Sequence, residues 1–207
     1  MQTATLAPLR EGERLTREEF ERRYEVMPDV RAELIEGVVY MASPTKNLHA
    51  AAQAVLVAWA GAYAARTPGV LVRNAMSYRI DERSELQPDV VLMREPRQGG
   101  KAKIDADGFL VGAPELVIEV AVTSFAHDLG AKLKLYERAG VQEYLVWEAE
   151  AQRMNWWSLH QERYVPLTPN PAGMWCSQVF SGLCLDVAAL ARLDIAAVLK
   201  PYLTSAG

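Results

Sequence analysis

The sequence has few of the residues that build zinc sites and disulfide-rich folds. Its 207 residues include two cysteines, Cys176 and Cys184, and three histidines. Residues so few and so scattered exclude a zinc site of the usual ligand spacing and a framework of several disulfides. We therefore expect a protein of a reducing, cytoplasmic compartment.

A strong net charge is also lacking. The chain has 22 Lys and Arg residues against 26 Asp and Glu residues, which gives a formal net charge of −4. Such a charge exerts no general attraction on polyanions, so a nucleic-acid contact would depend on a local basic patch. Because 50% of the residues are hydrophobic and 23% are charged, disordered, collagen-like and coiled-coil chains are excluded. The length suits a single α/β domain over residues 1–207.

Long hydrophobic runs of the membrane type are missing as well. Residues 1–14 have no apolar core of the kind found in signal peptides. The uncharged stretch from Leu48 to Ala65 approaches the length of a membrane span. It is dominated by alanine, however, and contains His49 and Gln53. We therefore predict a buried helix in a soluble protein that has no membrane partner.

The pattern of apolar and turn-forming residues predicts an α/β fold. Thr16 is a typical N-cap for a charged helix over 17–26, and a hairpin-like element surrounds Gly37 over 34–41. The order helix, strand, strand, strand, helix, strand follows and favours a mixed sheet, with the last helix as a crossover between parallel strands. We predict helices over 47–66, 125–139 and 187–199, and strands over 70–73, 76–80, 89–93, 116–122, 144–147, 154–159 and 164–167.

Carboxylates occur in strands that should otherwise be buried. Asp89 begins the strand PDVVLM, and Glu119 lies in the middle of ELVIEVAV. Strict alternation places Glu119 on the face opposite to Ile118 and Val120. An ionised glutamate in a buried strand is costly unless a partner neutralises it. Either acid could instead lie at a sheet end or pair with an arginine, and Pro-Asp before a strand is an ordinary loop feature.

The helix predicted after Glu119 carries a lysine on its apolar side. At about 100° per residue, Lys132 falls in the same sector as Leu129, Leu133 and Tyr136. A lysine in this position either extends its ammonium to the helix edge or neutralises a buried anion. Glu119 on the preceding strand would supply that anion.

An aspartate, a glutamate and a lysine on successive elements suit metal-dependent phosphodiester hydrolysis. Carboxylates bind Mg²⁺ or Mn²⁺, which prefer oxygen ligands and also accept a phosphate oxygen. Such a cation activates a bound water, and a nearby lysine can orient that water and stabilise the charge that develops on the phosphate. We therefore predict that Asp89 and Glu119 bind Mg²⁺ or Mn²⁺ and that Lys132 is catalytic.

The same residues carry a resemblance to a known family. The order Pro88–Asp89 before a strand, Glu119 in the next strand and Lys132 in the following helix resembles the PD-(D/E)XK nuclease superfamily. More closely, the chain is similar to the Uma-two family of bacterial restriction endonucleases. The stretches that match are 32–37, His49, 87–93 and 114–148.

The resemblance implies a restriction-endonuclease-like core with the order α-β-β-β-α-β, formed by about residues 47–148. An N-terminal helix and hairpin and extra C-terminal strands would complete one nuclease-like domain. It also implies metal binding by Asp89 and Glu119, and an assisting acid from the early hairpin. Glu33 has the motif position and Glu36 is the alternative, since alternation directs only one of them inward. The superfamily's usual lysine position is Ala121 here, and within this family the role falls to Lys132.

Further residues are candidates for accessory roles. His49 matches a family position, although a structural, hydrogen-bonded histidine is the alternative. Tyr136 shares the stripe of Lys132 and could act near the site or serve only as a core aromatic residue. A basic cluster after the Asp89 strand could grip a phosphate backbone or form a solvated loop; it comprises Arg94, Arg97, Lys101 and Lys103.

These observations lead to a functional hypothesis with rivals. We predict a hydrolase acting on ester bonds, a Mg²⁺- or Mn²⁺-dependent endonuclease whose substrate is double-stranded DNA. A homodimer is expected, because a two-fold pair matches the pseudo-symmetry of a duplex. The alternative is a catalytically silent nuclease-like domain that serves as a binding or assembly module. A third reading is a buried Glu119–Lys132 ion pair with no ligand.

Overall fold

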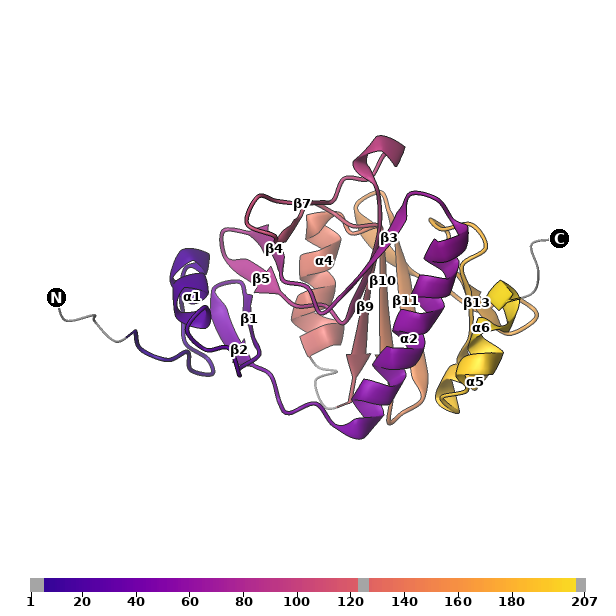
Figure 1. Cartoon of the computed structure of the whole chain (residues 1–207), viewed down its shortest axis with the longest axis horizontal. Coiled ribbons are helices and arrows are strands. Elements are labelled where there is room, and N and C mark those ends of the chain that lie inside the picture. Colours follow the sequence, from indigo (N-terminus) through magenta and orange to yellow (C-terminus); the bar gives the residue numbers. More distant parts are fainter. Residues whose placement is uncertain (1–5, 123–126, 204–207) are drawn as a thin grey trace.

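The computed structural model describes residues 6–122 and 127–203. Strands of these residues form two six-stranded sheets and a two-stranded sheet. Helix α1 and the first hairpin lie at one end of the molecule, and the C-terminal helices lie at the other (Figure 1). The predicted α/β class with a mixed sheet flanked by helices is confirmed.

The central sheet has the strand order β12-β11-β10-β9-β6-β3. Strands β9 and β10 are parallel, as predicted, and the other neighbours are antiparallel. The bounds are β3 (Val70–Asn74), β6 (Val90–Arg94), β9 (Leu116–Ala121), β10 (Glu143–Glu148), β11 (Arg153–His160) and β12 (Arg163–Pro166).

Both faces of the central sheet are covered. Leu116, Ile118 and Val120 of β9 pack with helix α2 (Asn47–Arg66) and with the C-terminal helices α5 (Val187–Ala191) and α6 (Ile195–Leu203). Val117 and Ala121 pack on the other face with helix α4 (Leu133–Ala139). The alternation predicted for this strand is therefore confirmed.

Judged by length and composition alone, helix α2 is the one helix among the described residues that is long and apolar enough to cross a membrane. Its Leu56, Trp59 and Ala60 are fully buried in the core beside the central sheet. The prediction of a core helix over 47–66 agrees with its observed bounds and packing.

The N-terminal sheet has the strand order β2-β1-β5-β4-β8-β7 and packs against α1 (Arg17–Tyr24). Thr16 caps α1, because its hydroxyl oxygen accepts a hydrogen bond from the backbone N–H of Glu19 at 3.3 Å. Glu36 and Gly37 form the first hairpin turn with φ of 51° and 82°, and glycine meets the second value without strain. The bounds are β1 (Ala32–Ile35), β2 (Val38–Met41), β4 (Tyr78–Asp81), β5 (Ser84–Leu86), β7 (Lys103–Ile104) and β8 (Leu110–Val111).

The helix predicted over 125–139 is only partly correct. Residues Asp128–Lys132 form a π-helical turn, η2, which continues into α4 and ends at Gly140 with φ of 80°. The first predicted residues, 125 and 126, lie outside the described part of the chain. In a π turn the hydrogen bonds run from residue i to i+5, so side-chain directions computed for an α-helix do not apply there. The predicted helix over 187–199 is likewise divided into α5 and α6.

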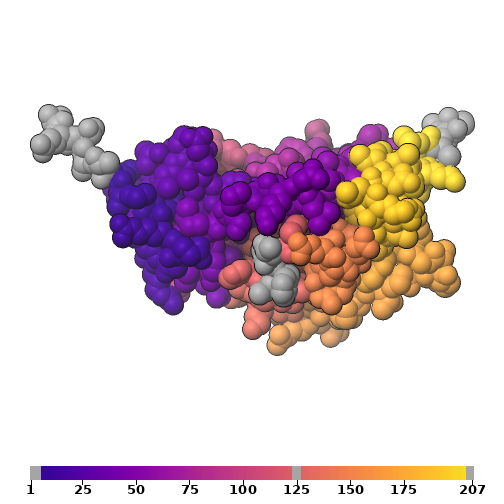
Figure 2. All heavy atoms as spheres, turned by 90° about the horizontal axis from the view of Figure 1, so that it is seen from below, coloured from indigo at the N-terminus to yellow at the C-terminus, as the bar shows by residue number. Residues whose placement is uncertain are grey.

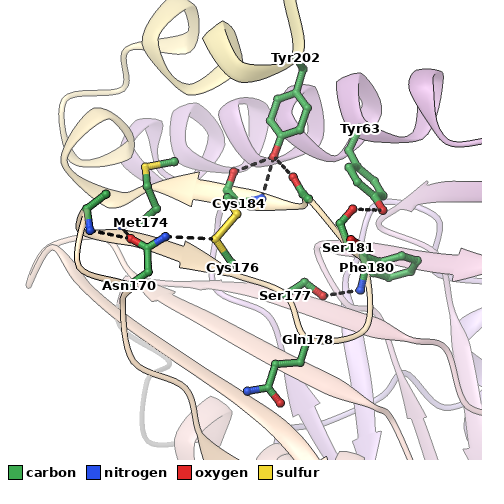
Figure 3. The surroundings of a disulfide bond; sticks show 12 residues. Tyr63, Asn170, Met174, Cys176, Ser177, Gln178, Phe180, Ser181, Cys184 and Tyr202 are labelled. Carbon is green, nitrogen blue, oxygen red and sulfur yellow. Dashed lines mark hydrogen bonds between the residues drawn. A yellow bond between two sulfur atoms is a disulfide. The ribbon is translucent and has the colours of Figure 1, made fainter.

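A disulfide, which was not predicted from the sequence, joins Cys176 and Cys184 (Figure 3). The bond connects strands β13 (Met174–Cys176) and β14 (Cys184–Asp186), which form the two-stranded sheet. Their antiparallel register places the two cysteines directly opposite each other, with Cα atoms 4.1 Å apart. The phenol of Tyr202 donates a hydrogen bond to the backbone oxygen of Cys184 at 2.7 Å, which ties α6 to this sheet.

Candidate active site

The predicted acids line one cavity together with His49 from the beginning of α2. Figure 1 shows that β9 ends and α2 begins at the same end of the central sheet. Val90 of β6 pairs with Ile118 of β9. Because the strands are antiparallel, the same register brings Asp89 opposite Glu119. Both residues are only 4% exposed. Figure 2 looks onto this end and shows the N-terminal part beside α2.

Lys132 lies at the centre of the site, and its ammonium contacts carboxylates from three elements. Its Nζ lies 2.8 Å from Oε2 of Glu33 on β1, 3.1 Å from Oε1 of Glu119 on β9 and 3.3 Å from Oδ1 of Asp128 on the π turn. Tyr136 donates a hydrogen bond to the same Oε1 of Glu119 at 3.1 Å. We call these residues, with Asp89, the Lys132 cluster.

Asp89 is held from two sides. The backbone N–H of Val120 donates to its Oδ2 at 2.8 Å, and Nε2 of His49 lies 3.2 Å from the same oxygen. Gln53 of α2 donates to the backbone oxygen of Asp89 at 3.3 Å. The other ring nitrogen of His49, Nδ1, is buried and has no hydrogen-bond partner among the described residues. His49 therefore fixes the orientation of the Asp89 carboxylate.

Burial and crowding of charge shift the pKa values of Glu119 and Lys132. Burial raises the pKa of Glu119 well above its usual value, and repulsion by Asp128, Asp89 and Glu33 adds to the shift, while Lys132 opposes it. Burial also acts to lower the pKa of Lys132, but attraction by Glu119, Glu33 and Asp128 outweighs it and raises that pKa well above the usual value. Lys132 is thus a cation at neutral pH, surrounded by more acids than it can neutralise.

The charged residues of the Lys132 cluster line a cavity of about 720 Å³, here called the site cavity. Oδ1 of Asp89 and Oε2 of Glu119 take part in none of the hydrogen bonds found among the described residues, and both side chains line the cavity. No group of three or more His, Cys, Asp or Glu side chains in the described chain is arranged to hold a metal ion. The available oxygens nevertheless fit Mg²⁺ or Mn²⁺, which are often bound by only one or two carboxylates together with waters and a substrate phosphate.

The structure distinguishes the two acids of the first hairpin. Glu33 lines the site cavity and pairs with Lys132. The side chain of Glu36 is 58% exposed and forms an ion pair with Arg138 at 3.0 Å. Glu33 is therefore the hairpin acid that faces the site.

The predicted basic cluster is not brought to the site. Arg94 lies at the opposite end of β6 from Asp89, roughly 16 Å along the strand, and its guanidinium donates to the backbone oxygen of Val179 at 2.7 Å. Arg97 belongs to the 3₁₀ turn η1 (Pro96–Gln98), which Figure 1 shows at the far edge of the sheet. None of Arg94, Arg97, Lys101 and Lys103 lines the site cavity, which is lined by described residues of β1, β2, the start of α2, β9 and the π turn.

Sequence reasoning missed other residues that line the site. Asp128 was not a candidate, although its spacing of four from Lys132 is the spacing of helical ion pairs. Tyr40, Arg31 and Lys46 also line the cavity. Tyr40 lies in β2, Arg31 immediately precedes β1 and Lys46 immediately precedes α2, and no sequence pattern linked them to Asp89 or Glu119.

Comparison with known proteins gives a consistent result. The chain matches the family model Uma2, described as "Putative restriction endonuclease", over residues 17–188. A crystal structure of "a putative nuclease belonging to DUF820" from Anabaena variabilis ATCC 29413 matches with a TM-score of 0.67 and 15% sequence identity. The match covers 86% of this chain and 98% of that chain, and at this identity it shows the fold alone. The comparison with curated proteins gave no match. The chain therefore belongs to the Uma2 family and has its nuclease-like fold.

Proposed function

We propose that the chain is a Mg²⁺- or Mn²⁺-dependent endonuclease that hydrolyses phosphodiester bonds of nucleic acid, with DNA as the default substrate. Membership of the Uma2 family, described as "Putative restriction endonuclease", supports the nuclease class. The observation that carries the proposal is the site itself. Asp89 and Glu119 line one cavity beside the buried ammonium of Lys132.

Asp89 and Glu119 are the residues that would hold the cation. Each uses one carboxylate oxygen for contacts within the described part of the protein, and both residues line the cavity. A bound divalent cation would supply an activated water and offset the charge of the phosphate. Val120 and His49 keep the Asp89 carboxylate in a single orientation, and Tyr136 does the same for Glu119.

Lys132 would act on the substrate through its charge. Its ammonium is buried next to the carboxylates that would bind the cation, so a phosphate at this place would meet a fixed positive charge in a medium of low polarity. Such preorganised charge is most effective at a transition state in which negative charge increases. Glu33 contacts the same ammonium and holds it in position.

A catalytically silent module is the second candidate, and a specific contact favours it. The ammonium of Lys132 already contacts Glu33, Glu119 and Asp128. A lysine so fully paired can serve to keep buried acids together without catalysis. The two candidates differ in whether the cavity takes up a divalent cation.

Calorimetric titration of Mn²⁺ tests the proposal. Wild-type protein should bind Mn²⁺, in the presence of inorganic phosphate if not alone, and Asp89→Asn and Glu119→Gln should each abolish binding while the proteins remain folded. Glu36→Gln is the matched control, because Glu36 is an exposed acid on the same hairpin. Lys132→Ala should then abolish cleavage of DNA. Absence of Mn²⁺ binding to the wild type under both conditions would favour the silent module.

The assembly state and location are also proposals. A homodimer would allow both strands of a duplex to be cut, and sedimentation measures it. A cytoplasmic location, expected from the low cysteine content, is opposed by the Cys176–Cys184 disulfide, because such bonds are rare in reducing compartments. Alkylation and mass analysis of protein taken directly from cells would decide whether the two thiols are free.

A further inference from the structure

The site cavity extends beyond the Lys132 cluster to an outer wall of different character. Tyr40 and Met41 of β2 supply aromatic and apolar surface, and Arg31 and Lys46 supply positive charge. The proposed chemistry uses none of these residues. An aromatic ring and cations beside a phosphodiesterase site are the features that contact the base and backbone of a nucleic-acid strand.

Tyr40 is placed next to the acids by the pairing of the first hairpin. It lies directly opposite Glu33 in the register of β1 and β2, and opposite residues on antiparallel strands project from the same face. The ring centroid of Tyr40 lies 4.8 Å from that of His127, with the two rings inclined by 62°. Its hydroxyl takes part in none of the hydrogen bonds found in the described chain, so contacts of the hydroxyl do not account for its place in the cavity.

Arg31 and Lys46 are cations without a carboxylate partner among the described residues. The Nε of Arg31 donates to the side-chain oxygen of Gln87 at 2.8 Å, and no ion pair involves either residue there. Glu11 also lines the cavity and opposes their charge, but its carboxylate accepts a hydrogen bond from the backbone N–H of Met41. Unpaired cations at the rim of a cavity favour an anionic ligand.

The depth of the acids restricts how a substrate can reach them. Asp89 and Glu119 are 4% exposed and Lys132 is 7% exposed. The cluster of basic residues that could have gripped a long duplex lies at the far end of β6. Specific contacts to duplex DNA use an extended, strongly basic surface, whereas an extruded or unpaired nucleotide can enter a pocket.

We propose that the site cavity receives an unpaired nucleotide, and that the substrate is single-stranded nucleic acid or an unpaired segment of a duplex. The base stacks on Tyr40, and the flanking phosphates contact Arg31 and Lys46. This inference rests on the proposed nuclease function and names the substrate class of that same site. It differs from the double-stranded DNA predicted from the sequence, and under it the homodimer argued from cleavage of both strands of a duplex is not required.

Fluorescence anisotropy with labelled oligonucleotides tests the proposal on the full chain. The probes are a twelve-nucleotide single-stranded DNA, an RNA strand of the same sequence and a fully paired DNA hairpin. To prevent cleavage, the titrations are made without divalent cation. The single strands should bind at least tenfold more tightly than the hairpin, and the comparison of DNA with RNA identifies the sugar that is preferred.

Variants of the outer wall separate stacking from charge. Tyr40→Ala should weaken single-strand binding roughly tenfold to a hundredfold, and Tyr40→Phe should retain it, because stacking requires the ring and not the hydroxyl. Arg31→Ala with Lys46→Ala should lower the slope of log affinity against log salt by about 1.4, at about 0.7 per phosphate contact on a single strand. Arg97→Ala is the matched control, because Arg97 is an exposed cation at the far end of the central sheet. It should change neither the affinity for single strands nor the salt slope.

The failure of this inference can be distinguished from the failure of the proposed function. If the paired hairpin binds and is cut as well as the single strand, or if Tyr40→Ala binds normally, the inference is wrong while the nuclease proposal stands. If single strands bind through Tyr40 but no probe is cut with Mn²⁺, the inference stands and the cavity belongs to a silent binding module. If no probe binds at any salt concentration, the inference is overturned, and Mn²⁺ titration still tests the metal site.

Discussion

Replacement of Lys132 is the sharpest test of how the site is built. Lys132→Met retains most of the apolar stem and removes the ammonium, which contacts Glu33 at 2.8 Å, Glu119 at 3.1 Å and Asp128 at 3.3 Å. At an effective dielectric constant of about 20, one ion pair at about 3 Å contributes about 5 kcal/mol before desolvation is subtracted. Removal of one partner of a buried pair costs about 3–5 kcal/mol. We expect the free energy of unfolding to fall by that amount.

The effect should depend on pH in a defined direction. Burial and neighbouring acids raise the folded-state pKa of Glu119, so the folded protein takes up a proton at Glu119 more readily than the unfolded chain does. Stability contributed by that proton is present at low pH and is lost as pH rises through the folded-state pKa. Without the ammonium of Lys132, the ionised form of Glu119 becomes even less favourable in the folded protein. Lys132→Met should therefore be most destabilising at alkaline pH and least destabilising near pH 5.

Urea unfolding followed by circular dichroism measures these changes. Lys132→Met combined with Glu119→Gln should recover part of the loss, because one of the three carboxylates is then neutral while Glu33 and Asp128 still lack the ammonium. Lys134→Met is the matched control, an exposed lysine two residues further along the same helix, and should change stability by less than about 0.5 kcal/mol. A loss below about 1 kcal/mol for Lys132→Met, or full additivity in the double variant, would refute the account of a buried, mutually dependent cluster.

Further predictions concern other parts of the chain. Burial and the nearby Glu21 raise the pKa of Glu85 to about 8, so its contribution to stability is lost as pH rises from about 5 to about 8; Glu85→Gln should flatten this part of the wild-type pH profile of thermal unfolding. Reduction of the Cys176–Cys184 bond, which closes a loop of sequence separation 8, should cost about 2–3 kcal/mol, measured by urea unfolding with and without reductant. Tyr136→Phe should cost about 1.5–3 kcal/mol, because Glu119 loses a hydrogen bond; an unchanged free energy of unfolding would show that this hydroxyl is dispensable.

Much of the fold followed from simple periodicity. The alternation in β9 determined which face Glu119 would occupy, and the alanine-rich run gave the bounds of α2. These elements are long and strongly patterned, so local sequence determines them. The short strands β5, β7 and β8 escaped prediction because two or three residues carry no periodic signal, and their pairing partners lie far away in the chain.

The site was predictable in its components but not in its geometry. Asp89, Glu119 and Lys132 stood out because a charge in an apolar pattern needs a partner. The spacing of four between Asp128 and Lys132 was a usable signal for their ion pair, whereas the π turn in which both lie was not predicted from the sequence. For the basic cluster the sequence left a phosphate-binding role and a solvated loop both open. Its nearness to Asp89 along the chain could not decide between them, because β6 carries Arg94 to the opposite end of the sheet.

The position of Glu33 has a consequence for how the molecule folds and opens. Glu33 belongs to the N-terminal sheet, whereas Glu119 and Asp89 lie in or beside strands of the central sheet. The ammonium of Lys132 bridges them, so the complete site exists only while both sheets are docked. A partly unfolded molecule that has released its first hairpin would keep an intact central sheet and yet lose a carboxylate and Tyr40 together. A ligand in the cavity should therefore slow hydrogen exchange in β1 and β2 more than in the rest of the protein.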